Sequence, residues 1–163
     1  MHLRQLAILI LGLCTQLSTP YMLYKGLGVA ANTHSPIVGV LSGSMEPGFH
    51  RGDLLFLWNR GDTRVGDIVV YTVQGKNVSI VHRVIAKFGG GAEPLSVLTK
   101  RDNNQGDDRP LYAPGQQYVD REKDVVGRVV GTVPYVGYLS LVMEDYPWAK
   151  VVLGGLIALS VMA

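Results

Sequence analysis

The segment DIVVYTV at residues 67–73, the four residues QGKN at 74–77 and the segment VSIVHRVIA at 78–86 decide the fold. Both longer segments are rich in Val, Ile and other residues that favour strands, and the short polar segment between them is typical of a hairpin loop. Two antiparallel strands are therefore expected at the centre of the chain. A second loop of this kind is expected at Gly89-Gly90-Gly91.

Similar short apolar runs stand on both sides of this hairpin. Clusters of Gly, Asn, Asp and Pro separate them, as expected for strands joined by turns. The middle of the chain shows no sustained 3.6-residue apolar period, so little helix is expected there. The sequence thus predicts a mainly β, mostly antiparallel domain, with further strands at Pro36–Leu41, Asp53–Trp58, Leu95–Leu98 and Val125–Val133.

Charged residues are concentrated in the middle of the chain. They make up 17% of the 163 residues, against about 25% in an average soluble domain. Residues 1–40 contain two basic residues and no acidic one, and residues 148–163 contain a single charge. The middle holds twelve basic and thirteen acidic residues, an ordinary balance for a domain in water. Three regions are expected: an N-terminal anchor at 1–31, a β domain at 32–147 and an apolar helix at 148–163.

Leu6–Tyr24 carries no charge and contains four polar side chains among nineteen residues. A helix of this length extends about 28 Å, close to the roughly 30 Å thickness of the hydrocarbon layer. We expect a retained transmembrane anchor, with Arg4 on the cytoplasmic side. Two other interpretations are a secretory signal that is cleaved near the small residues Val29 and Ala31, and a buried core helix.

The apolar run Val151–Ala163 is shorter than an ordinary span and more typical of an interfacial or re-entrant helix. Tyr146 and Trp148 precede it, as aromatic side chains do at a membrane surface. Whether this helix crosses the membrane is left open by the sequence.

Several classes of site are disfavoured. The net charge is +2 and no stretch is strongly basic, which argues against nucleic-acid binding. Cys14 is the single cysteine, so the chain has no internal disulfide and no cysteine-based zinc site. The four histidines include no pair at i and i+4 and no H-E-x-x-H motif, so no metal site is expected.

Four polar clusters in the middle of the chain could carry chemistry. Serine, histidine and an acid on separate elements are the components of a nucleophile, a general base and an orienting group. Each also has a structural interpretation, because Ser-Gly sequences and loop acids form turns and a strand histidine is often simply packed. The clusters are Ser42-Gly43-Ser44-Met45-Glu46-Pro47, His82, Asp102-Asn103-Asn104 and Asp107-Asp108-Arg109.

In this order and spacing the clusters resemble the signal peptidase I family, in its endoplasmic-reticulum and archaeal branch, and in particular the catalytic subunits of eukaryotic signal peptidase complexes. The bacterial branch has a lysine base at the position of His82, so the chain resembles the Ser-His-Asp variant. Arg101 departs from the pattern, because the family usually has glycine before Asp102. Further matching segments are Gly52-Asp53, Gly66-Asp67-Ile68-Val69-Val70-Tyr71 and Val81-His82-Arg83-Val84.

The resemblance implies a β domain of the signal peptidase type and a membrane-anchored serine endopeptidase. Such an enzyme removes signal peptides from secretory and membrane protein precursors, cutting after small residues at the −1 and −3 positions, with no cofactor. Ser44 would be the nucleophile, His82 the general base and Asp108 the group that orients His82. Ser42 would donate to the oxyanion, Asp102 would have a supporting role, and shallow pockets would be lined in part by Val38, Val40 and Met45.

The resemblance further implies precursor proteins, other subunits of a signal peptidase complex and membrane lipid as partners. The place would be the endoplasmic-reticulum membrane, in a single-pass type II topology with the β domain lumenal. A non-catalytic subunit of the same complex is one alternative, although all three catalytic side chains are present. A self-cleaving repressor-type peptidase is another, although it would use a lysine base. Asn77 begins the sequon Asn77-Val78-Ser79 and is a candidate glycosylation site.

Overall fold

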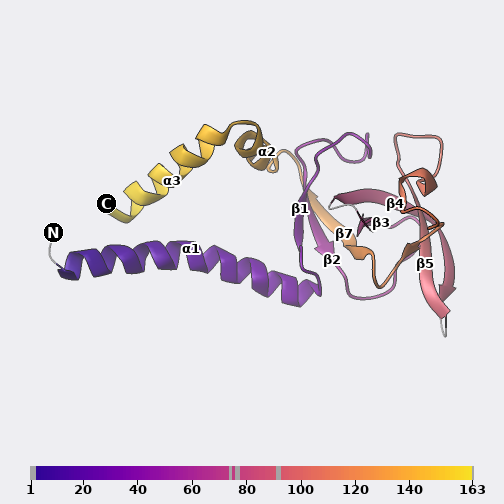
Figure 1. The fold of residues 1–163 in the computed structure, drawn as a ribbon, viewed down its shortest axis with the longest axis horizontal. Coiled ribbons are helices and arrows are strands. Elements are labelled where there is room, and N and C mark those ends of the chain that lie inside the picture. The colour runs from indigo at the N-terminus through magenta and orange to yellow at the C-terminus, as the bar shows by residue number, and fades with distance from the viewer. Residues whose placement is uncertain (1–2, 74, 76–77, 91–92, 163) are drawn as a thin grey trace.

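The structure, a computed structural model, describes residues 3–73, 75, 78–90 and 93–162. Within these residues a seven-stranded sheet forms a β domain at one end of the molecule, in the order β1-β2-β7-β3-β4-β5-β6 (Figure 1). All neighbouring strands are antiparallel, which confirms the predicted fold class. The strands are β1 (Ile37–Gly39), β2 (Leu54–Trp58), β3 (Ile68–Thr72), β4 (Ser79–Gly90), β5 (Glu93–Lys100), β6 (Val119–Asp120) and β7 (Val125–Val133).

The predicted central hairpin is formed by β3 and β4, with Thr72 opposite Ser79 and Val69 opposite His82. Of the predicted loop at 74–77, only Gly75 lies within the described residues, and its φ is +82°. Of the second predicted loop, Gly89 and Gly90 belong to the end of β4, and Gly91 lies outside the described residues. Gly89 and Gly90 have positive φ, and the register shifts between Phe88 and Gly90, so the glycines form an irregular strand end.

The sheet buries apolar side chains on both faces. Successive residues of a strand point to opposite faces, so Val69 and Tyr71 on β3 pack into one cluster and Val70 into another. This two-sided burial explains why β3 is an unbroken apolar run and not an alternating one. The first cluster also holds Val73, Val84, Val97, Leu98, Tyr112, Val119 and Val125, and the second Val40, Leu55, Leu57 and Val126.

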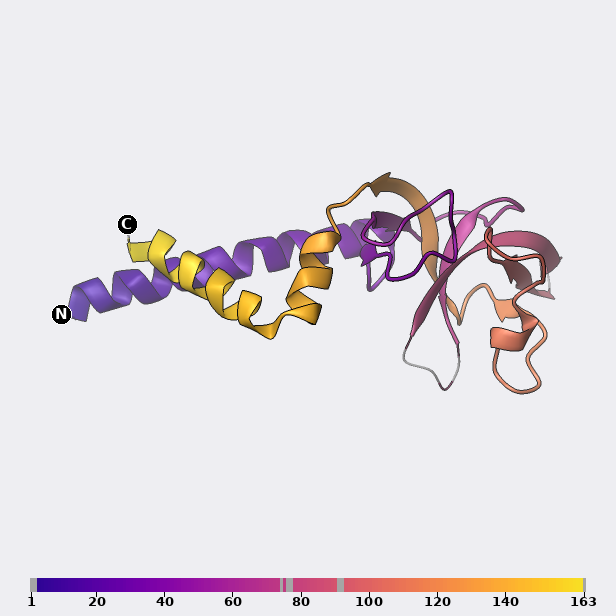
Figure 2. The ribbon, with the colours of Figure 1, turned by 90° about the horizontal axis from the view of Figure 1, so that it is seen from above.

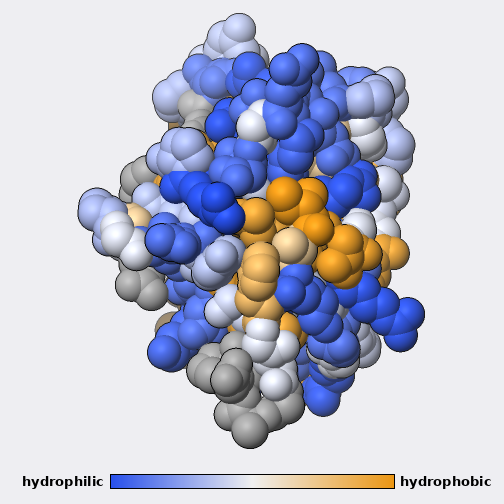
Figure 3. Space-filling model, turned by 90° about the vertical axis from the view of Figure 1, so that its right-hand side faces the viewer, coloured by the Kyte–Doolittle hydropathy of each residue, from blue (hydrophilic) through white to orange (hydrophobic). Residues whose placement is uncertain are grey.

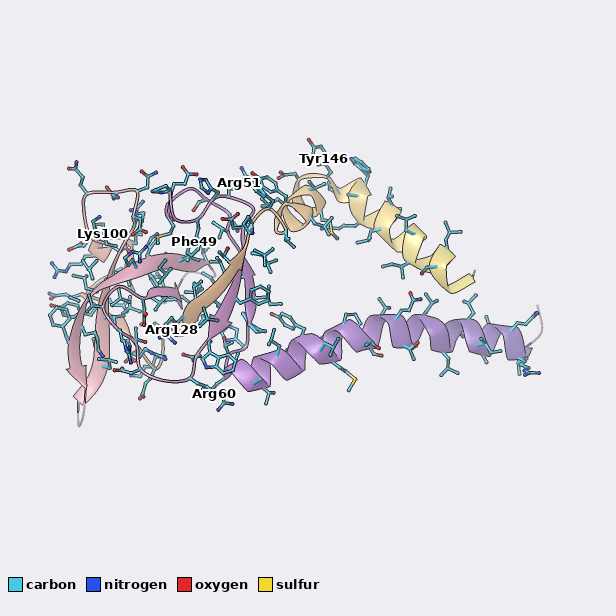
Figure 4. All side chains as sticks on the ribbon, turned by 180° about the vertical axis from the view of Figure 1, so that it is seen from behind. Phe49, Arg51, Arg60, Lys100, Arg128 and Tyr146 are labelled. Atoms are coloured by element: carbon cyan, nitrogen blue, oxygen red, sulfur yellow. The ribbon has the colours of Figure 1, made fainter. Side chains whose placement is uncertain are left out.

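Helix α1 (Leu3–Ala31) is long and apolar enough to cross a membrane, and no side chain of its most apolar stretch is buried. The interpretation as a core helix is therefore wrong. The last turn of α1 is fastened to the β domain. Ala31 is fully buried, and its carbonyl accepts a hydrogen bond of 2.8 Å from the Asn59 N–H. Arg60 donates to the Ala30 and Val29 carbonyls at 2.6 and 2.9 Å (Figure 4).

Two helices follow the sheet, α2 (Tyr138–Asp145) and α3 (Pro147–Met162), and Tyr146 lies between them (Figure 4). The expectation of little helix before residue 148 missed α2. An eight-residue helix offers only two turns of apolar period, and α2 is held by tertiary packing of Tyr138 over Gly52 and by burial of Leu141. A single turn of 3-10 helix, Arg109–Leu111, was not expected either.

Helices α1 and α3 extend from the same side of the β domain (Figures 1 and 2). The far end of α3 contacts α1, where the Ser160 hydroxyl donates to Gln16 Oε1 at 3.4 Å. At the opposite end of the molecule the β domain is mostly hydrophilic around a single apolar patch (Figure 3). This face of the β domain (Figure 3) is thus mostly polar, whereas many large apolar side chains of α1 and α3 are exposed.

Candidate active site

Ser44 lies in a loop of turns between β1 and β2. The loop is braced from a distant part of the chain, because the Asn103 backbone N–H donates to the Ser44 carbonyl at 3.2 Å. The Asn103 side-chain amide also donates to the Gly43 carbonyl at 3.4 Å. The Asp-Asn-Asn cluster found in the sequence therefore holds the serine loop in place.

His82 is a buried residue of β4, 3% exposed. Its Nδ1 lies 2.6 Å from Oδ2 of Asp108, which is completely buried between β5 and the 3-10 turn. Burial opposes ionisation of Asp108, but hydrogen bonds from His82 and Thr99 outweigh it, and its pKa lies below the ordinary value. Because a carboxylate only accepts hydrogen bonds, Nδ1 of His82 carries the hydrogen and Nε2 is the basic nitrogen.

A cavity of about 600 Å³ brings the serine and the histidine together. Ser44 and His82 both line it, and so do the predicted pocket residues Val38, Val40 and Met45. Within the described residues the Ser44 hydroxyl makes no hydrogen bond to His82, and its side-chain contact is Ser42 Oγ at 3.4 Å. Catalytic hydrogen bonds are commonly longer in a free enzyme than in its substrate complex. The remaining lining is largely apolar and includes Phe49, Ile80 and Leu111.

The acidic residues of the site divide into different environments. Asp108 contacts His82, whereas Asp102 accepts two hydrogen bonds from Arg83, at 2.9 and 2.6 Å. The Arg83 guanidinium holds the pKa of Asp102 below its ordinary value. Asp107 lies 3.6 Å from Arg109 at the surface. Of the three loop acids, Asp108 is therefore the one in contact with the histidine.

Comparison with known proteins places the chain in a family. The family model described as Peptidase S24-like matches residues 15–130. The catalytic subunit sec11 of the signal peptidase complex of Pyrenophora tritici-repentis is 56% identical over 163 residues, covering 99% of this chain and 94% of its own. The corresponding subunits of Tuber melanosporum and Pyricularia oryzae are 54% and 51% identical over 98% of this chain and 90% and 93% of their own. The chain belongs to the Peptidase S24-like family.

For this S24-like peptidase, the structure also shows contacts that the sequence did not suggest. Two buried hydroxyl groups, on Tyr71 and Thr99, contact Asp108, and the buried hydroxyl of Tyr112 contacts that of Thr99. Burial raises the pKa of both tyrosines, so their hydroxyls stay protonated. Thr99 was missed because the predicted strand ended at Leu98, two residues before the end of β5 at Lys100.

Arg101, the departure from the family pattern, lines the cavity of the peptidase. Its Nε lies 3.6 Å from Oδ1 of Asp108, the carboxylate oxygen that does not face His82. Both atoms are buried, and neither has a hydrogen-bond partner within the described chain. Arg101 therefore adds positive charge beside the carboxylate without replacing its contact to His82.

Neither a metal cluster nor the sequon adds to the described site. No three His, Cys, Asp or Glu side chains come together as metal ligands in the described part of the chain. Asn77, the candidate glycosylation residue, lies outside the described residues.

Proposed function

We propose that the protein is a membrane-anchored serine endopeptidase of the endoplasmic reticulum that removes signal peptides from precursors, with Ser44, His82 and Asp108 as its catalytic residues. The 2.6 Å contact between His82 and Asp108 beside the cavity that holds Ser44 carries this proposal. Relatives that are 51–56% identical are named catalytic subunits of signal peptidase complexes, which supports the same substrate. A non-catalytic subunit is disfavoured, because it would not need a buried Asp-His pair facing a serine.

In the proposed reaction Ser44 Oγ attacks the carbonyl carbon of the scissile peptide bond, and Nε2 of His82 takes the serine proton. Asp108 stabilises the imidazolium that forms. His82 then returns the proton to the leaving amine, and water hydrolyses the acyl-enzyme by the same route in reverse. The backbone N–H of Ser44 and the hydroxyl of Ser42 would donate to the oxyanion, and loss of one such donor lowers the rate about 10²–10³-fold.

The substrate would lie extended in the cavity that is lined by Val38, Val40 and Met45. These side chains leave room for small residues at the −1 and −3 positions and would exclude large ones. Residues 1–31 would form a type II anchor, with the β domain at 32–147 on the lumenal side and 148–163 associated with the membrane. Precursor proteins, membrane lipid and other subunits of a signal peptidase complex would be its partners, and neither a cofactor nor nucleic acid is required.

Cleavage of a secretory precursor by the assembled complex tests this function. The wild-type complex should release the mature protein with the N-terminus that follows the small −1 residue, as read by mass spectrometry. A complex with Ser44→Ala should leave the precursor intact, whereas Asp62→Asn, a change in a surface residue that pairs with Lys87, should cleave normally. Equal cleavage by the wild-type and Ser44→Ala complexes would disprove the proposal.

A further inference from the structure

A buried chain of polar groups continues from Asp108 away from His82. Thr99, the next-to-last residue of β5, is completely buried. Its hydroxyl oxygen lies 2.8 Å from Oδ2 of Asp108 and 2.9 Å from the hydroxyl of Tyr112. The Thr99 backbone N–H donates to the same Tyr112 hydroxyl at 3.0 Å. The backbone N–H of Asp108 donates to the Thr99 carbonyl, also at 3.0 Å.

The direction of these hydrogen bonds follows from the number of protons available. Two acceptors lie near the single hydroxyl proton of Thr99, Oδ2 of Asp108 at 2.8 Å and the Tyr71 hydroxyl at 3.2 Å. The ionised Asp108 only accepts and is both nearer and charged, so the proton is donated to Oδ2. The contact between Tyr112 and Thr99 must then run from the Tyr112 hydroxyl to Thr99 Oγ1. Tyr112 can supply that proton, because burial raises its pKa and keeps it protonated. Each donor in such a chain polarises the next, which strengthens the bond that reaches the carboxylate.

The same carboxylate oxygen therefore receives hydrogen bonds from two sides. His82 donates through Nδ1 at 2.6 Å and Thr99 through its hydroxyl at 2.8 Å. Two donors at fixed positions restrict rotation of the Asp108 side chain. A fixed carboxylate in turn holds the ring of His82 with Nε2 available for the serine proton.

We propose that Thr99 and Tyr112 are positioning residues for the peptidase reaction, forming a directed hydrogen-bond chain from Tyr112 through Thr99 to Asp108 that orients His82. This inference rests on the proposed function. The chain also withdraws negative charge from Asp108. Without this hydrogen-bond chain the carboxylate would bind the imidazolium form of His82 more strongly, which would move the acid limb of the pH–rate profile to higher pH.

Other groups also face the Asp108–His82 pair. The Tyr71 hydroxyl on β3 lies 3.4 Å from Nδ1 of His82 and 3.5 Å from Oδ2 of Asp108. Arg101 approaches Oδ1 of Asp108 at 3.6 Å. The charge of Asp102 is neutralised by its own partner, Arg83. Among these groups, Thr99 makes the shortest contact to the carboxylate after His82.

Three variants of the assembled complex test the proposed hydrogen-bond chain. Thr99→Val keeps the shape of the side chain and removes the hydroxyl, Thr99→Ser restores a hydroxyl, and Tyr112→Phe removes the first donor. The rate constant kcat/KM for precursor cleavage is measured across the pH range for each. Thr72→Val on β3 is the control, because the Thr72 hydroxyl donates to the Asp124 carbonyl and not to the site.

Thr99→Val should lower kcat/KM on the order of 10–100-fold, as expected for loss of a hydrogen bond to a charged group, and should move the acid limb of the pH profile to higher pH. Thr99→Ser should stay within about threefold of the wild type, and Tyr112→Phe should move the acid limb in the same direction with a smaller loss. Thr72→Val should match the wild type.

Wild-type rates and profile in Thr99→Val would overturn the proposal, as would equal losses in Thr99→Val and Thr99→Ser. A lower rate with an unmoved acid limb would also overturn it, since that is the result of a packing defect. If Thr99→Val does not accumulate as folded protein, Tyr112→Phe tests the proposal in its place. An unmoved acid limb in the pH profile of Tyr112→Phe would contradict the proposed hydrogen-bond chain. None of these outcomes changes the comparison of wild type with Ser44→Ala, which tests the function separately.

Discussion

Arg83 and Asp102 form a two-bond ion pair that joins β4, one residue after His82, to the loop that precedes Asp108. The next residue of this loop, Asn103, holds the Ser44 carbonyl. One short segment therefore connects the strand of His82, the loop of Ser44 and the loop of Asp108. From this arrangement we infer that the role of Asp102 is structural.

Replacing Asp102 by Asn should lower the thermal stability at neutral pH more than at acid pH. The folded-state pKa of Asp102 lies below its unfolded value, so the ion pair stabilises the fold above about pH 4 and is lost as the pH falls through the lower folded value. Thermal unfolding followed by circular dichroism between about pH 7 and pH 3 should show two melting temperatures that converge on acidification. Asp107→Asn, in a more exposed pair, is the control, and a constant difference across the range would contradict the assignment.

The loop acids should differ in their effect on catalysis. Asp108→Asn keeps the shape of the side chain but can donate to Nδ1, which favours the wrong tautomer of His82 and should lower kcat about 10⁴-fold. Asp107→Asn should change kcat little, because exposed ion pairs contribute only about 0–1 kcal/mol. Precursor cleavage at matched concentrations of folded protein gives the ranking. A larger loss in Asp107→Asn than in Asp108→Asn is the result that contradicts it.

Gly52 should tolerate no side chain, because α2 packs directly on it. Its φ is +92°, and a Cβ at this position would overlap the ring of Tyr138. Gly52→Ala should destabilise the fold by about 1–3 kcal/mol and expose α2 to limited proteolysis. Gly61→Ala has a similar φ of +89° with open space around the new Cβ, so it isolates the backbone effect. Equal effects of the two changes would rule out the packing explanation.

The N-terminal helix should remain on the mature chain. Cleavage near Ala31 would require an extended peptide in an active site. In the structure this residue ends a helix, is completely buried and accepts a hydrogen bond from Asn59. The intact mass of the purified protein should therefore include the helix Leu3–Ala31. A mature N-terminus at Asn32 would show that the helix is a cleaved signal.

The sequence predicted the parts of the fold that local patterns encode. The strands β2, β3 and β7 were placed within one residue, because apolar runs and turn residues mark their ends, whereas β4 extends four residues beyond its predicted end at Ala86. Helix α2 escaped detection because its stability comes from packing over Gly52, which no local pattern records. The strand β5 extends to Lys100, beyond the predicted end at Leu98, because its last residues are polar ones that the fold buries or pairs.

The candidate site was predictable only through the resemblance to a family. Spacing alone could not rank Asp102, Asp107 and Asp108, since all three lie in one loop. Their difference arises from tertiary contacts, with His82 for Asp108 and with Arg83 for Asp102. The hydroxyls of Tyr71 and Thr99 come from separate strands and meet at the Asp108 carboxylate only in the folded sheet, and Tyr112 joins them through Thr99.

The most direct test of the central claim is whether His82 and Asp108 act as one unit with Ser44. The measurement is kcat for precursor cleavage by complexes with His82→Ala, with Asp108→Asn and with both changes. If Asp108 acts through His82, the double variant should be no slower than His82→Ala alone, because residues that act as a unit have strongly non-additive effects. Losses that multiply in the double variant would contradict the account.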